Sequence, residues 1–431
     1  MDKIIISGGN PLYGNVSISG MKNAALPVIC ACILNKETCI IDNIPPISDI
    51  ETLLMILSSM GADVKMLTKN SVQINCRNII PGSSPNELAS KLRGSSYILG
   101  AELGRFGKSS VYSPGGCSIG PRPLDLHMKA FEALGAHCSH RNGRIEITTD
   151  SYLKGNSIFF DKVSVGATVN TILASVLADG VTIIDNAARE PHIVDLAVFL
   201  NACGANIIGA GTSVIKIKGV SKLHGCRYSI IPDMIEAGTY MAAVAATGGK
   251  VTVRNVIPKH LEAISIKLEE AGVNIITGSD YITVESTGKL KGISLTTGPY
   301  PGFATDMQPQ FSAMLCFAEG ASDIHEQVFD NRFQYTDELA KMGADIKVSA
   351  NHSIIRGGSP MTGAPLVCRD LRAGAAMVIA ALASEGTSEL LEIDKIERGY
   401  YKITEKFASL GADIKLVSDI SSAQINRSAS I

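Results

Sequence analysis

One cysteine is a candidate for chemistry because of the loop in which it lies. Cys117 belongs to the segment Ser113–Pro123, which holds three glycines and three prolines among eleven residues. This composition predicts an irregular loop that packs little and can move. Arg122 follows five residues later, and a nearby cation favours the thiolate form of a cysteine. Cys117 could therefore act as an acid or a nucleophile, although a loop cysteine without a role fits the local sequence equally well.

A second chemical signal is a set of basic residues at the predicted starts of helices, where the helix dipole makes a cation locally unfavourable. The residues concerned are Lys22, Arg93 and Arg372 in one class of helix, and Arg122, Arg189, Arg332 and Arg398 in another. Helix starts that also carry guanidinium groups can bind phosphate and carboxylate groups. We therefore expect several of these residues to share an anionic ligand. Solvated surface arginines are the alternative, above all for Arg189 and Arg332.

Three acidic residues are candidate bases. Asp306 follows the Pro- and Gly-rich stretch Gly298–Thr305, and Asp233 and Asp370 stand at the starts of other helices. Each could instead cap its helix, because Thr305 and Gln308 have the spacing of a capping box. Spacing alone does not choose between the two roles.

The elements that must position these residues follow a sixfold repeat. Six stretches end in glycine, a small or β-branched residue and a short apolar run, and their glycines are Gly61, Gly135, Gly204, Gly272, Gly343 and Gly411. These glycines lie 68 to 74 residues apart, and each fits a helix C-cap that leads into a strand. A fixed period of this kind indicates one supersecondary unit used six times. Each unit reads as strand, helix, strand, helix, strand, strand.

Two kinds of helix alternate within the repeats. The first helices are rich in Ala and Gly and are predicted at Asn23–Leu34, Gly94–Leu103, Gly166–Ala178, Ile235–Ala246, Met307–Ala318 and Ala373–Ala383. A helix that is apolar all round must be buried. The second helices, such as Ile50–Met60 and His260–Ala271, are amphipathic and should face outward.

The length of 431 residues suggests two domains of three units each. We place one domain at residues 1–20 plus 232–420, with both termini, and the other at residues 21–231, with the Cys117 loop. A polar tail at residues 421–431 should be frayed. The strands at Lys3–Ile6 and Asn15–Ile18 precede the first helix, so we expect them to complete the last unit.

Composition argues against several classes of function. A net charge of −2 gives no support for nucleic-acid binding. No apolar window approaches 18 residues, and the apolar start Ile4–Ile6 stops at Gly8, so we expect neither membrane insertion nor a signal peptide. The ten cysteines lack the spacing of a disulfide framework and read as reduced thiols of a cytoplasmic protein.

Apart from Cys117, the cysteines are predicted to be buried packing residues: Cys30, Cys32, Cys39, Cys76, Cys138, Cys203, Cys226, Cys316 and Cys368. His137, Cys138 and His140 lack the fourth ligand of a zinc site, so we expect no metal. We also expect no cofactor.

Several of these motifs together resemble one family. The stretches Ser19–Pro27, Pro114–Leu126, Val163–Thr168, Pro301–Gln308 and Asp370–Gly374 resemble the UDP-N-acetylglucosamine enolpyruvyl transferases, and the resemblance runs from Met1 to about Val417. It implies a two-domain inside-out α/β barrel built from six βαβαββ repeats, which is the enolpyruvyl transferase fold. That architecture agrees with the six units read from the glycines.

The resemblance also implies a reaction. The family transfers the enolpyruvyl group of phosphoenolpyruvate to the 3′-hydroxyl of UDP-N-acetylglucosamine and releases phosphate, which is the first committed step of peptidoglycan synthesis. Cys117 would protonate the methylene carbon and form a covalent adduct with phosphoenolpyruvate. Asp306 would accept the proton of the sugar hydroxyl.

The resemblance further assigns residues to the two substrates. The phosphate and carboxylate of phosphoenolpyruvate would contact Lys22, Arg122, Arg372 and Arg398, of which Lys22 and Arg398 also count as catalytic. The uridine diphosphate would contact Arg93, Arg122, Pro123, Leu124, Asp125, Leu126, Lys162, Val163, Ser164 and Val165. Asn23 and the backbone of Val328 would hold the sugar. We expect a monomer or a weak homo-oligomer.

Two other classes compete with this interpretation. The shikimate-pathway enolpyruvyl transferases share the six-unit fold and phosphoenolpyruvate, but they need no loop cysteine and lack the Arg122–Leu126 segment. A ring-shaped DNA clamp is also built from six α/β units, yet its central helices would have to be basic, whereas the first helices here are nearly uncharged.

A first prediction concerns the acid. Cys117→Ser should lose nearly all turnover while it keeps the fold, because a hydroxyl is a much weaker acid than a thiol. Cys117→Asp should stay active, since a carboxyl group can also donate a proton, but it should form no thiol adduct. Phosphate release measures both variants, and wild-type turnover by Cys117→Ser would contradict the assigned role.

A second prediction concerns inhibition. The resemblance implies that fosfomycin, an epoxide with a phosphonate group, binds to Lys22, Arg122 and Arg398, and that the Cys117 thiolate opens its ring. We expect time-dependent inactivation that UDP-N-acetylglucosamine accelerates. Mass spectrometry should find one adduct, on the Cys117 peptide. Equal inactivation of Cys117→Asp, or an adduct on another cysteine, would contradict this expectation.

Overall fold

The six repeat glycines all end helices in a left-handed conformation. The protein is described by a computed structural model for residues 2–113 and 123–418, in which these glycines have φ between 94° and 101°. They follow α2 (Ser48–Ser59), α5 (Asp125–Ala133), α7 (Pro191–Ala202), α9 (Glu262–Glu270), α11 (Thr336–Lys341) and α14 (Ile403–Ser409). The residue after each glycine donates its N–H to a carbonyl five residues earlier, as Ala62 does to Leu57 at 3.0 Å. This Schellman geometry confirms the predicted C-caps.

The chain divides into two units, each built from three repeats. The terminal unit contains the described residues of Met1–Ile18, Met234–Gly298 and Gly302–Ile431, and the inserted unit contains those of Ser19–Asp233 and Pro299–Pro301. The sequence placed the corresponding boundaries after residues 20 and 231. The predicted tail at residues 421–431 lies outside the described residues.

The strands form a separate sheet for each repeat, and the two units repeat one topology. In the inserted unit the sheets are β13 (Arg227–Ser229), β3 (Thr38–Asp42), β5 (Ser71–Asn75) and β4 (Asp63–Thr68); β6 (Lys108–Tyr112), β8 (Arg144–Thr148) and β7 (His137–Arg141); and β11 (Asn206–Ile208), β12 (Val214–Lys218), β10 (Val181–Asp185) and β9 (Ser157–Phe159). In the four-stranded sheets of this unit, one parallel pair joins two antiparallel pairs.

The terminal unit contains three four-stranded sheets and a two-stranded one. They are β15 (Asn274–Thr277), β16 (Tyr281–Ser286), β14 (Gly249–Arg254) and β2 (Leu12–Ser17); β18 (Ser294–Thr296), β20 (Ala321–His325), β22 (His352–Arg356) and β21 (Asp345–Ser349); β23 (Pro365–Val367), β24 (Thr387–Leu391), β1 (Lys3–Ser7) and β25 (Asp413–Val417); and β17 (Leu290–Lys291) with β19 (Ala318–Glu319). None of these sheets closes into a barrel within the described residues.

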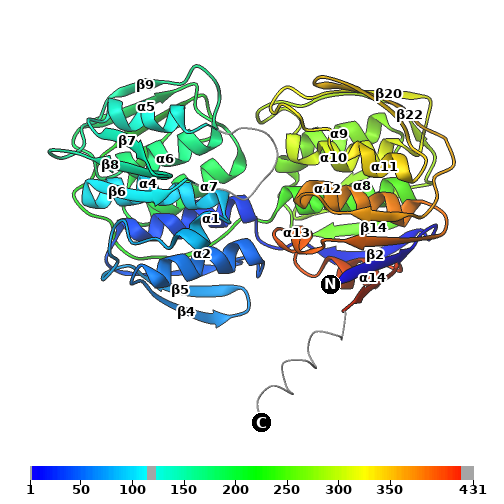
Figure 1. Ribbon diagram of the computed structural model, residues 1–431, viewed down its shortest axis with the longest axis horizontal. Helices are drawn as coiled ribbons and strands as arrows, with labels where there is room; N and C mark the ends of the chain where they lie inside the picture. Colours follow the sequence, from blue (N-terminus) through cyan, green and yellow to red (C-terminus); the bar gives the residue numbers. More distant parts are fainter. Residues whose placement is uncertain (1, 114–122, 419–431) are drawn as a thin grey trace, which may run out of the picture. The chain divides into compact units, whose positions relative to one another are not determined.

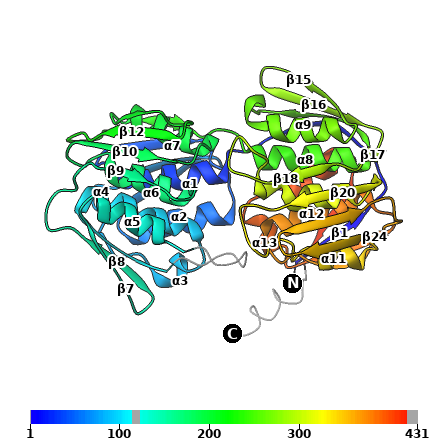
Figure 2. The same cartoon turned by 90° about the horizontal axis from the view of Figure 1, so that it is seen from above.

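The first helices lie inside the sheets. They are α8 (Met234–Thr247), α10 (Gln308–Leu315) and α12 (Leu371–Ala383) in the terminal unit, and α1 (Lys22–Ala31), α4 (Tyr97–Phe106) and α6 (Val165–Ser175) in the inserted unit. Every residue of α10 is buried, as are nearly all those of α8 and α12. In Figures 1 and 2 strands surround the three central helices of the terminal unit on several sides. The predicted α/β class with buried helices is confirmed.

Most of the second helices face outward, with one exception. Helix α9 buries only Ile264 and Leu268, as expected of an amphipathic surface helix. Helix α7 instead buries eight of its twelve residues, including Phe199 and Asp195, because it packs against α1 as well as its own sheet. Short helices complete the set: α3 (Asn86–Ala89), α13 (Asp394–Glu397) and the 3-10 helices η1 (Cys32–Leu34), η2 (Arg93–Ser96), η3 (Pro258–Leu261) and η4 (Thr305–Met307). No helix of the described residues is long and apolar enough to cross a membrane.

The two N-terminal strands, β1 and β2, join different sheets. Strand β1 pairs antiparallel with β24 and β25, so it completes the last repeat as predicted. The same prediction is wrong for β2, which pairs in parallel with β14 of the fourth repeat. A Cβ atom at Gly249 would lie only 2.0 Å from the Leu12 carbonyl oxygen, so this close pairing depends on a glycine in β14.

A buried carboxyl group joins α4 to the segment before α3. The side chain of Glu102 is fully buried and accepts hydrogen bonds from the Gly82 N–H at 2.8 Å and the Ser109 hydroxyl at 2.6 Å. Burial raises the pKa of Glu102 from its ordinary 4.5 to about 7. Folding therefore favours the protonated form.

A third prediction follows from this pKa. Because the folded pKa exceeds the unfolded one, the free energy of unfolding should fall as pH rises from about 4.5 to about 7, by up to about 3 kcal/mol from this group. Glu102→Gln should remove that dependence, since an amide keeps the acceptor and does not titrate. Urea unfolding of both proteins across this range measures the difference. The prediction would be contradicted if the difference in unfolding free energy between the wild type and Glu102→Gln did not change with pH.

Candidate active site

The carboxylate of Asp306 lies between two guanidinium groups. Its Oδ1 is 3.1 Å from Arg332 Nη2 and its Oδ2 is 2.8 Å from Arg372 Nη2. Asp306 lies in η4, and neither η4 nor α10 has a side-chain cap, so the capping interpretation of Asp306 is wrong. Two cations fix the carboxylate in orientation, and 29% of the side chain stays exposed.

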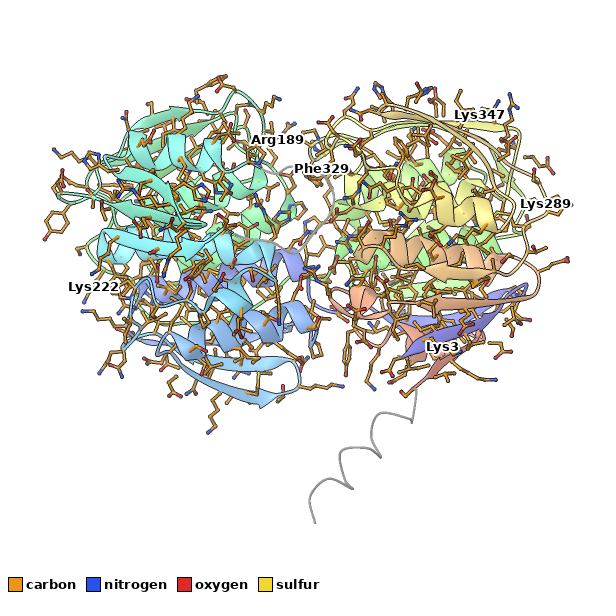
Figure 3. All side chains as sticks on the ribbon, in the orientation of Figure 1. Lys3, Arg189, Lys222, Lys289, Phe329 and Lys347 are labelled. Atoms are coloured by element: carbon orange, nitrogen blue, oxygen red, sulfur yellow. The ribbon has the colours of Figure 1, made fainter. Side chains whose placement is uncertain are left out.

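Arg332 is a member of this site that the sequence listed among the basic residues at predicted helix starts, with a surface role as the alternative. Its side chain is only 2% exposed, so the surface-arginine alternative is wrong for this residue. The guanidinium lies 5.6 Å from the centre of the Phe329 ring (labelled in Figure 3). Its Nε and Nη1 are buried and have no hydrogen-bond partner among the described residues. A buried guanidinium is stabilised chiefly by its carboxylate partner, which explains its place beside Asp306.

Arg372 connects Asp306 to the starts of the central helices. It is the second residue of α12, and Asp370 caps that helix by accepting hydrogen bonds from the N–H groups of Arg372 and Ala373. The capping interpretation of Asp370 is therefore confirmed. Arg372 Nη1 also donates to the hydroxyl of Tyr400 at 3.4 Å. That hydroxyl hydrogen-bonds to Thr239 of α8 at 2.8 Å and accepts from Gln310 of α10 at 3.2 Å.

Glu326 holds the two segments that carry Asp306 and Val328. Its Oε2 accepts from the Thr305 hydroxyl at 2.9 Å, and its Oε1 accepts from the backbone N–H groups of Val328 at 2.8 Å and Phe329 at 3.1 Å. The Val328 N–H is therefore engaged within the protein. What Val328 can offer a ligand is its carbonyl oxygen.

Arg398 departs from its predicted position. It is the C-cap of α13, five residues before α14 begins, so it does not start a helix. A cation at a helix C-terminus is favourable, and the argument from misplaced cations does not apply to it. Arg398 lies two residues before Tyr400 in the same turn.

In the inserted unit, Lys22 is held by a carboxylate. Lys22 is the first residue of α1, and its Nζ lies 2.6 Å from Asp49 Oδ2, with side-chain exposures of 12% and 7%. Its backbone N–H donates to Asp233 at 3.4 Å. The next residue, Asn23, is half-buried. The ammonium group is thus oriented by a fixed partner.

Three of the predicted nucleotide-binding segments meet at His127. Burial, followed by the charge of Arg93, lowers the pKa of His127 to about 3, so the imidazole is neutral. Asn170 Nδ2 lies 2.8 Å from its Nδ1, so Nδ1 is the acceptor and Nε2 carries the hydrogen. A Cβ atom at Gly166 would lie 2.9 Å from this ring, so the start of α6 approaches the ring closely only because residue 166 is glycine.

These contacts place Arg93, the start of α5 and the start of α6 together. Leu124 is the N-cap position of α5, which Asp125 begins and Leu126 continues, and Pro123 precedes it. Ser164 caps α6, its side chain accepting from the Ala167 N–H at 3.3 Å. The N-terminus of a helix favours anions. The adjoining predicted residues are Lys162, which is exposed, and Val163 and Val165, which are half-buried.

The remaining predicted residues take no part in the contacts given above. Cys117 and Arg122 lie outside the described residues. Among the other cysteines, Cys138 and Cys226 are only half-buried, so the expectation that all nine are buried is wrong for these two. No group of three or more His, Cys, Asp or Glu side chains in the described parts of the chain is placed to hold a metal ion.

The sequence has close relatives among characterised families. Residues 6–407 match the family model of EPSP synthase (3-phosphoshikimate 1-carboxyvinyltransferase). The chain is 54% identical over 416 residues to a UDP-N-acetylglucosamine 1-carboxyvinyltransferase 2 of Clostridium acetobutylicum, covering 96% of this chain and 99% of that one. It is 47% identical over 420 residues to the UDP-N-acetylglucosamine 1-carboxyvinyltransferase of Streptococcus pneumoniae serotype 2, covering 97% and 100%.

Solved structures share the fold. The enolpyruvyl transferase NikO from Streptomyces tendae matches with a TM-score of 0.87 at 25% identity, over 97% of this chain and 99% of that one. The EPSP synthase of Acinetobacter baumannii matches with a TM-score of 0.77 at 20% identity, over 97% and 100%. The fold is that of the enolpyruvyl transferases. The chain belongs to the EPSP synthase family and, within it, to the UDP-N-acetylglucosamine 1-carboxyvinyltransferases.

A fourth prediction concerns the partner of Lys22. Asp49→Asn should destabilise the protein by about 3 kcal/mol, the lower end of the range for breaking a buried ion pair, because Lys22 would keep its charge and lose its carboxylate. The matched control is Glu262→Gln, which breaks the exposed Lys259–Glu262 pair and should cost less than about 0.5 kcal/mol. Denaturant unfolding measures both, and equal effects would contradict the prediction.

Proposed function

We propose that this protein transfers the enolpyruvyl group of phosphoenolpyruvate to the 3′-hydroxyl of UDP-N-acetylglucosamine and releases phosphate. The reaction commits the sugar nucleotide to peptidoglycan synthesis. The observation that carries the proposal is the identity of 54% along almost the full length of a relative named for this activity. The arrangement around Asp306 supports it, because a partly exposed carboxylate is held in one orientation by two cations.

Asp306 is the proposed base. As the sugar hydroxyl attacks, its proton passes to the carboxylate, whose position the guanidinium groups of Arg332 and Arg372 maintain. Glu326 keeps the neighbouring Thr305 and Val328 in place, so we assign to Val328 a contact with the sugar through its carbonyl oxygen. Asn23 is the second proposed sugar contact.

Cys117 is the proposed acid, which adds a proton to the methylene carbon of phosphoenolpyruvate and so makes the adjacent carbon electrophilic. We assign the phosphate and carboxylate of this substrate to Lys22, Arg122, Arg372 and Arg398. Charge-assisted hydrogen bonds from several cations are what a small, highly charged anion requires. The Asp49 carboxylate orients Lys22 for this contact.

The proposed nucleotide contacts lie around His127. The helix start capped by Ser164 and the guanidinium of Arg93 would bind the diphosphate, and Pro123–Leu126 with Lys162–Val165 would line the uridine. A neutral His127 suits this role because it adds no charge and fixes α5 against α6. We further propose a cytoplasmic enzyme that is a monomer or a weak homo-oligomer, which sedimentation velocity would test.

The test is phosphate release from purified protein. Release should require both phosphoenolpyruvate and UDP-N-acetylglucosamine, and the nucleotide product should gain the mass of an enolpyruvyl group. Shikimate 3-phosphate serves as the competing acceptor. Release with shikimate 3-phosphate and none with UDP-N-acetylglucosamine would overturn the proposal in favour of the other branch of the family.

A fifth prediction tests the base. Asp306→Ala should lower turnover by about 10²–10⁴-fold, the usual contribution of a general base, with little change in nucleotide binding. A carboxylate that only paired with Arg332 and Arg372 would instead cost stability when it is removed, and turnover would be kept. Turnover, calorimetric nucleotide binding and the melting temperature are measured on the same variant, with Asp370→Ala as the matched loss of a true cap. Unchanged turnover would contradict the assignment.

A further inference from the structure

Two thiols in the inserted unit lie in direct contact. The sulfur atoms of Cys203 and Cys226 are 3.3 Å apart. Cys203 is the C-cap residue of α7, whereas Cys226 immediately precedes β13, 23 residues later. The two sulfurs therefore come from different elements, and only the fold brings them together.

The backbone around this pair is held closely. The His224 N–H donates to the Cys203 carbonyl at 2.9 Å, and the Ile40 N–H donates to the Cys226 carbonyl at 2.9 Å. The Gly225 N–H donates to Glu37 at 3.1 Å, and a Cβ atom at Gly225 would lie 2.1 Å from the Thr38 carbonyl oxygen. The segment at Cys226 is thus fixed against both β3 and the end of α7. A disulfide needs its sulfurs at about 2.05 Å, so the two sulfur atoms must approach each other further than their present 3.3 Å contact.

Core packing explains why Cys203 is buried, but it does not explain why a second thiol lies beside it. Cys203 precedes its repeat glycine, at the position that Met60, Leu134 and Leu410 occupy in other repeats, and all four side chains are buried. That position requires a buried apolar side chain and does not require a second thiol. Cys226 is half-buried, lies between the exposed residues His224 and Arg227, and follows a surface stretch that includes Lys222 (labelled in Figure 3). A small solute can therefore approach Cys226.

We propose that Cys203 and Cys226 are an oxidation site that forms an intramolecular disulfide with hydrogen peroxide as the oxidant. The Cys226 thiolate attacks one peroxide oxygen, the O–O bond breaks, and hydroxide leaves, so sulfur is oxidised to a sulfenic acid while peroxide is reduced. The Cys203 sulfur then attacks the sulfenic sulfur, its S–H proton leaves with the displaced hydroxide as water, and the S–S bond forms. In sum, two thiols and one peroxide give one disulfide and two waters.

Two properties of the surroundings bear on this chemistry. Burial raises the pKa of Cys226, so the thiolate is scarce and oxidation is slow. Cys39 of β3 lies beside both thiols and also accepts a hydrogen bond from the Asn35 amide at 3.4 Å. It is fully buried, so it is the competing partner for Cys203 but not the first point of attack. No metal site is available to the cluster within the described residues.

The test is peptide mapping of the full-length protein. Reduced protein is treated with hydrogen peroxide, unfolded, alkylated and digested without reductant. We expect Cys203 and Cys226 to lose their alkylation and a linked peptide pair to join them, which a reductant separates. The proposal would be overturned if Cys226 stayed alkylatable, ended as sulfinic or sulfonic acid, or formed a link to no thiol. A dominant link between Cys203 and Cys39 would overturn it as well.

A variant and an internal control sharpen the result. In the double variant Cys39→Ser/Cys203→Ser the sulfenic acid on Cys226 lacks both neighbouring thiols, so dimedone should label Cys226 there and not in the wild type. Cys138 is also half-buried and makes no hydrogen bond to another thiol in the part of the chain that the structure describes. It should be labelled by dimedone in both proteins and appear in no linked peptide. Dimedone labelling of Cys226 in the wild type to the same extent as in the variant would show that Cys203 does not resolve it.

Discussion

Six helices are largely buried and rich in apolar residues, and their enclosure is the constraint on which the rest of the structure depends. Helices α8, α10 and α12 cannot meet water without exposing large apolar areas, so the sheets of the terminal unit are arranged around them (Figures 1 and 2). Helices α1, α4 and α6 play the same part in the inserted unit. Each sheet therefore buries one face against these helices. The amphipathic second helices cover the remaining apolar surface.

Packing three apolar helices side by side also brings their polar starts together. In the terminal unit, the Tyr400 hydroxyl contacts residues of all three helices, and Arg372 carries that network on to Asp306. A buried polar group is costly unless it is satisfied, and among the described residues this network leaves Gln310 Oε1 and Arg332 Nε and Nη1 without a hydrogen-bond partner. The network ends at Asp306, whose carboxylate contacts two guanidinium groups and is still partly exposed. The active-site charge and the closure of the core are thus one arrangement.

In the inserted unit, helices are joined by an amide and a neutral imidazole. Asn170 donates to the Ser96 carbonyl and accepts from the Gly100 N–H, and it also contacts His127. Three helices are joined without a buried charge, because desolvation keeps the imidazole neutral. Elsewhere in this unit the Lys22 ammonium group is fixed by the Asp49 carboxylate. The proposed nucleotide contacts around His127 therefore lie on an uncharged network, whereas Lys22 lies beside a carboxylate.

The sequence by itself determined the repeated architecture. Six glycines at a nearly fixed spacing, with apolar helices between them, predict the units and the buried helices. Basic residues at predicted helix starts indicate Lys22 and Arg372 as candidates, whereas the role of Asp306 is implied by the family resemblance. Local pattern carries this information because caps and amphipathic faces involve residues close in the chain.

Contacts between residues distant in the chain were decided only by the tertiary structure. Arg332 looked like a surface residue until burial placed it against Asp306, and Arg398 proved to end a helix rather than begin one. Strand β2 joined the fourth repeat because Gly249 leaves room for it. The meeting of Cys203 with Cys226, and of His127 with Gly166, likewise depends on how separate elements pack, and no spacing along the chain encodes that geometry.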